Sequence, residues 1–176
     1  MNMLQECITI TIANTNDAEM LTSLSITTFC ETFMKDNKKE DMDKYIAEEM
    51  NIDRLAEELA DKNNLFFLAR YNETIVGYAK MRAIKKPDEL KSNDPIELER
   101  IYVLNEWHDK KIGAALMDHC IAYAISEQHD VLWLGVWEHN NKAVNFYKRY
   151  GFEFFGSHIF QLGDDQQTDV LMKKKL

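Results

Sequence analysis

Short apolar segments of strand length fill the second half of the chain, and only two amphipathic helical segments interrupt them. The segment 112–127 places Ile112, Leu116 and Cys120 at helical spacing, and 141–150 forms the second predicted helix. The predicted strands are 65–71, 74–84, 98–104, 131–137, 152–161 and 170–172. A strand series crossed twice by helices predicts a mixed sheet with helices on both faces, which is an α/β fold.

The first third of the chain has a different pattern. Residues 8–12 alternate Ile and Thr, which predicts a strand. Three amphipathic helices are then expected over 17–34, 40–50 and 53–61. A length of 176 residues with no visible internal boundary predicts one domain.

Charge is distributed unevenly along the chain. The net charge is −9, and residues 1–64 contribute −8 of it, with 6 Lys/Arg against 14 Asp/Glu. This balance argues against nucleic-acid binding, because proteins that bind phosphate backbones present basic patches. Two interpretations of the acidic third stay open: solvated helix faces, or a wall that attracts a cationic ligand.

Several other classes of protein are not expected. No apolar run approaches the roughly 20 residues of a membrane span, and no secretory signal is visible. The 3 cysteines are too few and too scattered for a disulfide framework, so a cytoplasmic location is expected. The five histidines show no metal-ligand spacing with the cysteines, and no metal site is predicted.

Residues 98–116 have the features of an anion site. A strand leads through Lys110 and Lys111 into a helix that opens with Gly113, Ala114 and Ala115. Free N–H groups and the helix dipole favour anions at such a terminus, and small residues allow close approach. The alternative is a glycine required for packing beside two surface lysines.

The strand before this site breaks the alternation of a simple strand. Leu98 and Ile101 are both apolar but differ in parity, so a regular strand cannot turn both to one face. A β-bulge near Glu99 and Arg100 would reset the register, and bulges often lie beside active sites. A strand buried on both faces is the alternative.

The third informative segment follows the strand 131–137. Asn140 or Asn141 can cap the next helix. Tyr147 lies seven residues after Asn140 on the same helix face, and Gly151 fits a helix stop. A tyrosine beside an anion site could donate a proton. The alternative is a tyrosine that only fills the core.

Together these segments resemble the GNAT superfamily of acyl-CoA-dependent N-acyltransferases. Residues 140–152 match the family pattern Asn-x-x-Ala-x-x-Phe-Tyr-x-x-x-Gly-Phe. The pyrophosphate pattern Gln/Arg-x-x-Gly-x-Gly/Ala aligns with residues 108–113, where His108 replaces Gln/Arg and Lys111 replaces the first glycine. The resemblance implies a single GNAT-type domain over 1–176 with a mostly antiparallel, strongly twisted sheet. Residues 1–64 would supply a strand and acceptor-side helices, and 65–176 the acetyl-CoA-binding core.

The resemblance also implies roles for individual residues around acetyl-CoA. Main-chain groups of 101–103 would bind the pantetheine arm, main-chain N–H groups of 110–116 would hold the pyrophosphate, and Tyr147 would protonate the leaving thiolate. The implied cofactor-binding residues are Ile101, Tyr102, Val103, His108, Lys110, Lys111, Ile112, Gly113, Ala114, Ala115, Leu116, Asn140, Ala143, Phe146 and Tyr147. Glu99 is the candidate base that deprotonates the amine, and a salt bridge to Arg100 or Lys80 is the alternative role for it.

The acceptor side is implied to lie in the N-terminal helices. Phe29, Phe33, Glu40, Asp41 and Tyr45 lie in a stretch similar to bacterial GNAT proteins that acetylate polyamines and diamines. The hypothesis is therefore acetyl transfer to a primary amine of a small, polycationic acceptor, by direct attack in a ternary complex. Protein or peptide acceptors, antibiotics or amino acids, and a non-catalytic acyl-CoA sensor are alternatives. An exposed sheet edge would also allow a homodimer.

Overall fold

The computed structural model describes residues 8–83 and 86–176. Cys7, the N-terminal residues before it, and the junction of the predicted strand 74–84 with the next loop at 84–85 lie outside the described residues. No described helix is long and apolar enough to cross a membrane. Among the described residues, no group of three or more His, Cys, Asp and Glu side chains is arranged to hold a metal ion.

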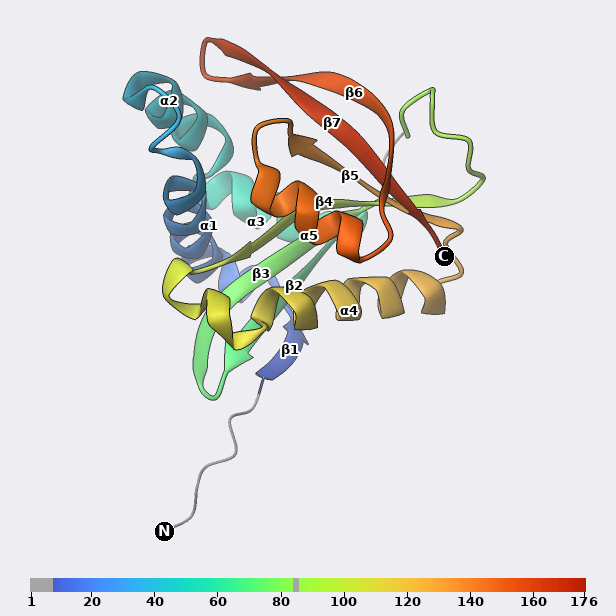
Figure 1. Cartoon of the computed structure of the whole chain (residues 1–176). Coiled ribbons are helices and arrows are strands. Elements are labelled where there is room, and N and C mark those ends of the chain that lie inside the picture. Colours follow the sequence, from blue (N-terminus) through green and yellow to red (C-terminus); the bar gives the residue numbers. More distant parts are fainter. Residues whose placement is uncertain (1–7, 84–85) are drawn as a thin grey trace.

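One seven-stranded sheet contains strands from both parts of the chain (Figure 1), in the order β1-β2-β3-β4-β5-β7-β6. The strands are β1 (Ile8–Ile12), β2 (Asn64–Tyr71), β3 (Thr74–Arg82), β4 (Pro95–Val103), β5 (Val131–Trp137), β6 (Glu153–Leu162) and β7 (Asp165–Lys175). Among the strands of the described residues, only the β4–β5 pair is parallel. The expected mixed, mostly antiparallel sheet is confirmed.

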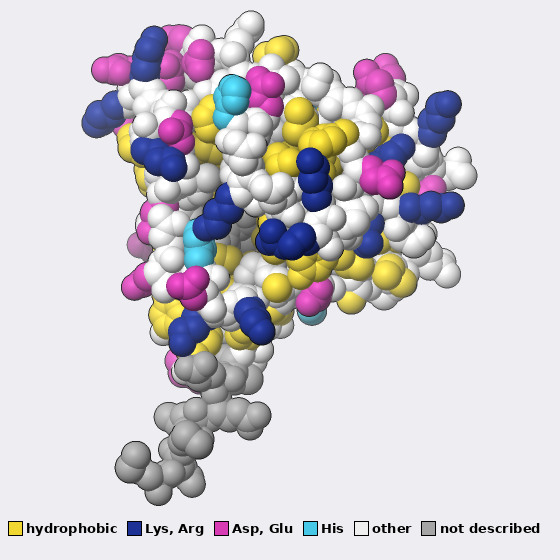
Figure 2. All heavy atoms as spheres, viewed as in Figure 1, with side chains coloured by type: hydrophobic (Ala, Val, Ile, Leu, Met, Phe, Trp, Pro, Cys, Tyr) yellow, Lys and Arg dark blue, Asp and Glu magenta, His cyan; other side chains and the backbone are white. Residues whose placement is uncertain are grey.

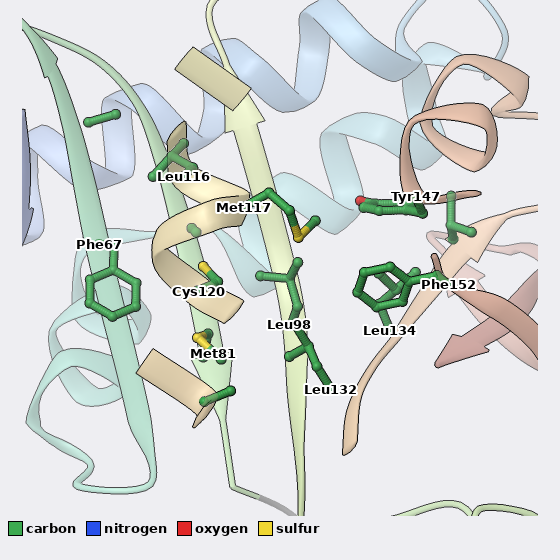
Figure 3. Close-up of a cluster of buried hydrophobic side chains, with 14 of the residues drawn as sticks. Phe67, Met81, Leu98, Leu116, Met117, Cys120, Leu132, Leu134, Tyr147 and Phe152 are labelled. Atoms are coloured by element: carbon green, nitrogen blue, oxygen red, sulfur yellow. The ribbon is translucent and has the colours of Figure 1, made fainter. Parts of the chain in front are cut away.

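Helices cover both faces of this sheet. They are α1 (Ala18–Phe33), α2 (Lys39–Glu49), α3 (Ile52–Ala60), α4 (Ile112–Ser126) and α5 (Asn141–Arg149). On one face, Leu116 of α4 and Tyr147 of α5 belong to the same buried cluster as Leu132 (Figure 3). On the other face, Leu21 of α1 and Leu55 of α3 pack with Phe66 and Tyr78. The expected α/β fold is therefore confirmed.

Strands β4 and β5 separate along their length. They pair only between Pro95–Glu97 and Val131–Trp133, although β4 continues to Val103 and β5 to Trp137. Their unpaired ends cannot form a continuous ladder, so the sheet opens at its centre. The sequence pattern did not predict this opening. The candidate functional site lies in it.

The predicted β-bulge lies in β4. Lys80 pairs with Arg100 and Met81 pairs with Leu98, so Glu99 is an extra residue without a register partner. As a result, Leu98 and Ile101 both pack in the cluster beneath α4 and α5. The extra residue of the bulge explains how Leu98 and Ile101 can face the same side despite their different parity. It also turns neighbouring polar side chains toward the opposite face.

The last hairpin extends further than its apolar residues indicate. The predicted strand 170–172 is only part of β7, whose polar residues from Asp165 onward pair with β6. Strand pairing uses main-chain groups, so polar side chains on an exposed hairpin do not prevent it. The tip packs against α2: a Cβ on Gly163, whose φ is +59°, would lie 2.5 Å from the Cα of Asp41. The backbone N–H of Asp164 also donates to Asp41, at 2.8 Å.

Candidate active site

A cavity of about 540 Å³ occupies the opening between β4 and β5. Its lining combines the ends of these strands with side chains from α1, α2, α4, α5, β6 and β7. Figure 2 shows a hollow on the viewed face with Lys and Arg side chains around its rim. The cavity therefore joins segments from both parts of the chain at one place.

The start of α4 gives one end of the cavity an anion-binding character. The first intrahelical hydrogen bond at this terminus runs from the N–H of Ala115 to the carbonyl of Lys111. The N–H groups of residues 112–114 precede that bond and have no acceptor within the helix. Gly113 and Ala114 line the cavity there, together with Lys111 and Lys142. Unpaired N–H groups, a helix dipole and two ammonium groups fit the pyrophosphate of acetyl-CoA.

His108 connects this terminus to both walls of the cavity. Its Nε2 lies 2.9 Å from the carbonyl oxygen of Val103, and its Nδ1 lies 2.8 Å from Nζ of Lys142. A carbonyl can only accept and an ammonium can only donate, so the proton of the neutral ring is on Nε2. The residue that replaces the family's Gln/Arg thus ties β4 to α5 across the cavity.

Lys111, which stands where the family pattern has a glycine, adopts a left-handed backbone conformation. Its φ is +59° and its ψ is +18°. A side chain with a Cβ is strained in this region by roughly 1–2 kcal/mol. Its side chain lines the cavity, so the position combines backbone strain with a positive charge beside the anion site.

We expect the Lys111→Gly variant to have a free energy of unfolding about 1 kcal/mol higher than wild type, because glycine relieves the left-handed strain. Its acetyl-CoA affinity should fall, because an ammonium leaves the anion site. Urea unfolding and calorimetric titration measure the two effects. The matched variant Lys111→Ala should lose affinity without gaining stability. If both variants changed the free energy of unfolding by the same amount, the result would contradict backbone strain at Lys111.

Most of the expected cofactor-binding side chains line the cavity, and four do not. Those that line it are Ile101, Tyr102, Val103, His108, Lys111, Gly113, Ala114, Asn140, Ala143, Phe146 and Tyr147. Lys110 instead places its Nζ 5.4 Å from the ring centre of Tyr71. Ile112 and Leu116 are buried in the core, and Ala115 is not part of the lining. Of these four, Ile112 has a main-chain N–H without an acceptor within the helix, whereas the N–H of Ala115 already donates to the carbonyl of Lys111.

Tyr147 has features of both interpretations that the sequence left open. Its residue is only 9% exposed and belongs to the core beneath α4 and α5, yet it also lines the cavity. In Figure 3 its ring extends from α5 with the hydroxyl directed toward the middle of the sheet. Burial raises the pKa of this hydroxyl above its ordinary value. The group is therefore protonated at neutral pH and has a proton to donate.

Asn140 caps α5 at the edge of the cavity. Its side-chain oxygen accepts a hydrogen bond from the N–H of Ala143, at 3.2 Å. This contact is the predicted helix cap, which holds the start of α5 against the cavity. The amide of Asn140 also lines the cavity, where its predicted contact with acetyl-CoA remains an expectation.

Glu99, the residue added by the bulge, lies among three cationic side chains. Its carboxylate is 2.7 Å from Nζ of Lys80 and 3.3 Å from both Arg82 and Arg100. Burial alone would raise the pKa of Glu99, but Arg100, followed by Lys80 and Arg82, outweighs burial and lowers it. A carboxylate with a lowered pKa is a weaker proton acceptor. The geometry therefore matches the alternative role of Glu99 in salt bridges.

Aromatic side chains line the part of the cavity where the sequence predicts the acceptor. The ring centre of Phe29 lies 4.8 Å from that of Phe33 and 5.0 Å from that of Tyr45. Phe33 also contacts Trp137, with ring centres 6.2 Å apart. All four line the cavity, as does Phe160 of β6. The three aromatic residues expected from the sequence are thus brought together, and Trp137 and Phe160 are additions from distant strands.

The two acidic residues expected on the acceptor side lie elsewhere. Glu40 is exposed on α2, and Asp41 binds the tip of the β6–β7 hairpin. No acidic side chain of residues 8–64 lines the cavity. Figure 2 shows acidic side chains along the edge where α1 and α2 lie. The carboxylates in the lining are Glu97, Glu99 and Asp169, which come from the less acidic part of the chain.

Comparisons with known proteins agree with this geometry. Residues 26–152 match the model of the acetyltransferase (GNAT) family. The chain belongs to the GNAT acetyltransferase family. An uncharacterised N-acetyltransferase of Lactobacillus delbrueckii subsp. lactis is 38% identical, over 88% of this chain and 89% of that protein.

A more distant relative and a solved structure also match this chain. A spermidine N(1)-acetyltransferase of Thermoplasma acidophilum is 24% identical, over 90% of this chain and 91% of that protein. The crystal structure of a PaiA N-acetyltransferase from Thermoplasma acidophilum in complex with coenzyme A has a TM-score of 0.79 at 22% identity, covering 97% of this chain and 99% of that one. This GNAT chain is an N-acetyltransferase that uses acetyl-CoA as its acetyl donor.

Proposed function

We propose that this acetyltransferase acts on a primary amine of a small, polycationic acceptor. The observation that carries the proposal is the composition of the acceptor side, where aromatic rings and carboxylates share one cavity. Aromatic faces attract ammonium groups, and Asp169 adds a carboxylate whose side chain is 15% exposed. The net charge of −9 also favours the approach of cations. The distant spermidine-acetylating relative supports the same class of acceptor.

In the proposed reaction, acetyl-CoA supplies the acetyl group through its thioester, and the amine attacks the thioester carbonyl directly. The start of α4, with Lys111 and Lys142, holds the pyrophosphate. Main-chain groups at the end of β4 orient the pantetheine arm. Tyr147 donates its hydroxyl proton to the departing sulfur, which avoids release of a free thiolate. A cytoplasmic location and a homodimer remain predictions.

A thiol-release assay with acetyl-CoA tests the acceptor against polyamines, monoamines, aminoglycosides, amino acids and peptides. We expect spermidine to be acetylated with the highest kcat/KM, and that value to fall as the NaCl concentration rises, because salt screens attraction between charges. Butylamine is the matched control, since it has one amine and no flanking charge, and its kcat/KM should depend less on salt. Activity on peptides alone would overturn the proposal of a small, polycationic acceptor. Activity on butylamine but not on spermidine would overturn it as well.

A further inference from the structure

A histidine and an aspartate from two neighbouring strands meet at the acceptor side of the cavity. His158 of β6 is the register partner of Asp169 of β7, which is in turn the partner of Trp137 in β5. Nε2 of His158 lies 3.5 Å from Oδ2 of Asp169, and both side chains line the cavity. The pair is therefore part of the same chamber as Tyr147 and the α4 terminus.

Gly135 makes room for this pair on the acceptor face of the sheet. A Cβ at Gly135 would lie 3.3 Å from Cε1 of His158 and 3.5 Å from Oδ2 of Asp169. Its neighbours Leu134 and Val136 pack beneath α4 and α5, and strand alternation turns position 135 to the opposite face. That face also carries α1 and the aromatic cluster. The imidazole thus lies on the same face as the aromatic residues that the proposed function assigns to the amine.

An amine acceptor presents a chemical requirement that Glu99 meets poorly. Primary amines are mostly ammonium ions near neutral pH, and an ammonium has no lone pair for attack. Glu99 is held by Lys80, Arg82 and Arg100, whereas the imidazole of His158 contacts a carboxylate. We propose that His158, oriented by Asp169, is the general base that removes a proton from the acceptor ammonium. The proposal rests on acetyl transfer to an amine and not on which amine is used.

The surroundings of the ring suit this role. The contact with Asp169 raises the pKa of His158, Glu97 of β4 adds to that effect, and burial and Arg82 of β3 oppose it. The nearby carboxylate favours the tautomer with its proton on Nε2, which leaves Nδ1 as the basic atom. The side chain of His158 is 43% exposed, so a captured proton can pass to solvent.

The proton balance of the proposed step is complete. One proton moves from the ammonium to Nδ1 of His158, and the neutral amine nitrogen forms a C–N bond with the thioester carbonyl carbon. The C–S bond breaks, and the sulfur takes the proton of Tyr147. The remaining surplus proton on nitrogen returns to the Tyr147 phenolate, while His158 releases its proton to water. The products are the N-acetyl amine and the free thiol of coenzyme A.

The pH dependence of kcat/KM for the best amine of the acceptor panel tests this assignment. We expect His158→Gln to lower kcat/KM by about 10²-fold at pH 7 and to move the acid limb up to the pKa of the amine itself. At high pH the variant should approach wild type, because the amine loses its proton unaided. Asp169→Asn should move the acid limb to lower pH, since the carboxylate that raises the pKa of His158 is gone. Acetyl-CoA affinity should stay unchanged in both variants.

The chain offers a matched control in a second histidine–aspartate pair. Nδ1 of His129 lies 3.3 Å from Oδ2 of Asp94, and neither residue lines the cavity. His129→Gln and Asp94→Asn should keep the wild-type profile. A wild-type acid limb in His158→Gln, or an equal loss at every pH, would overturn the proposal. If His158→Gln does not fold, the pH profile of Asp169→Asn tests the proposal instead. An acid limb that stays at its wild-type pH in Asp169→Asn would then overturn the proposal.

Discussion

Replacement of Tyr147 by Phe should lower kcat by about 10²- to 10⁴-fold and leave the acetyl-CoA dissociation constant nearly unchanged. The variant removes one hydroxyl and keeps the ring, so the packing beneath α4 and α5 is preserved. The hydroxyl is protonated at neutral pH because burial raises its pKa. Without it, the departing sulfur has no positioned proton donor. Steady-state kinetics and calorimetric titration measure the two quantities separately.

Tyr123→Phe is the control for this substitution. Tyr123 is on α4, with its ring centre 5.6 Å from that of Phe67, and it does not line the cavity. Its variant should retain wild-type kcat. If Tyr147→Phe also retains wild-type kcat, Tyr147 has only a packing role.

The second large effect concerns the buried charges beneath the bulge. Lys80 is 1% exposed, and its Nζ lies 2.9 Å from Glu58 and 2.7 Å from Glu99. Lys80→Met would leave both carboxylates without their shared ammonium. We expect the free energy of unfolding to fall by about 3–5 kcal/mol, because removing one partner of a buried ion pair leaves an uncompensated charge. Urea unfolding at neutral pH measures this loss.

An exposed ion pair provides the comparison. Lys39 pairs with Asp43 on α2, with side chains 73% and 54% exposed. Lys39→Met should change the free energy of unfolding by less than about 1 kcal/mol, since exposed pairs contribute little. Similar effects for Lys39→Met and Lys80→Met would show that the buried network does not contribute specifically to stability.

The pH dependence of stability follows from the same network. The folded-state pKa of Glu99 is lowered from its ordinary value of 4.5. A lowered carboxyl pKa contributes stability above the unfolded-state value, and that contribution is lost as pH falls toward the folded-state value. Acidification below about 4.5 should therefore destabilise the protein through Glu99.

Local sequence patterns predicted the parts of the fold that depend on local chemistry. The different parity of Leu98 and Ile101 indicated a bulge as one of two interpretations, and the structure contains it. The helical spacing from Ile112 predicted α4. These features depend on residues that are close in sequence, so each can be predicted from a single segment of the chain.

The features that sequence reasoning missed depend on long-range pairing. His158 and Asp169 belong to no motif, and they meet because β6 and β7 form a hairpin beside β5. Glu58, Lys80 and Glu99 come from three separate elements, and their arrangement required the sheet register. The acidic character of residues 1–64 indicated, as one interpretation, an acidic surface at the acceptor site. The charge along a sequence does not determine which helix face lines a cavity.

Titration of isotope-labelled protein with coenzyme A, followed by amide NMR, tests the central claim that the opening between β4 and β5 binds the acetyl donor. We predict that the largest chemical-shift changes occur at residues 101–103, at the end of β4, and at residues 112–114, whose N–H groups have no acceptor within α4. The C-terminal lysines 173–175, which lie outside the cavity lining, should change little. Largest changes at those lysines, with residues 101–103 and 112–114 unaffected, would contradict the account.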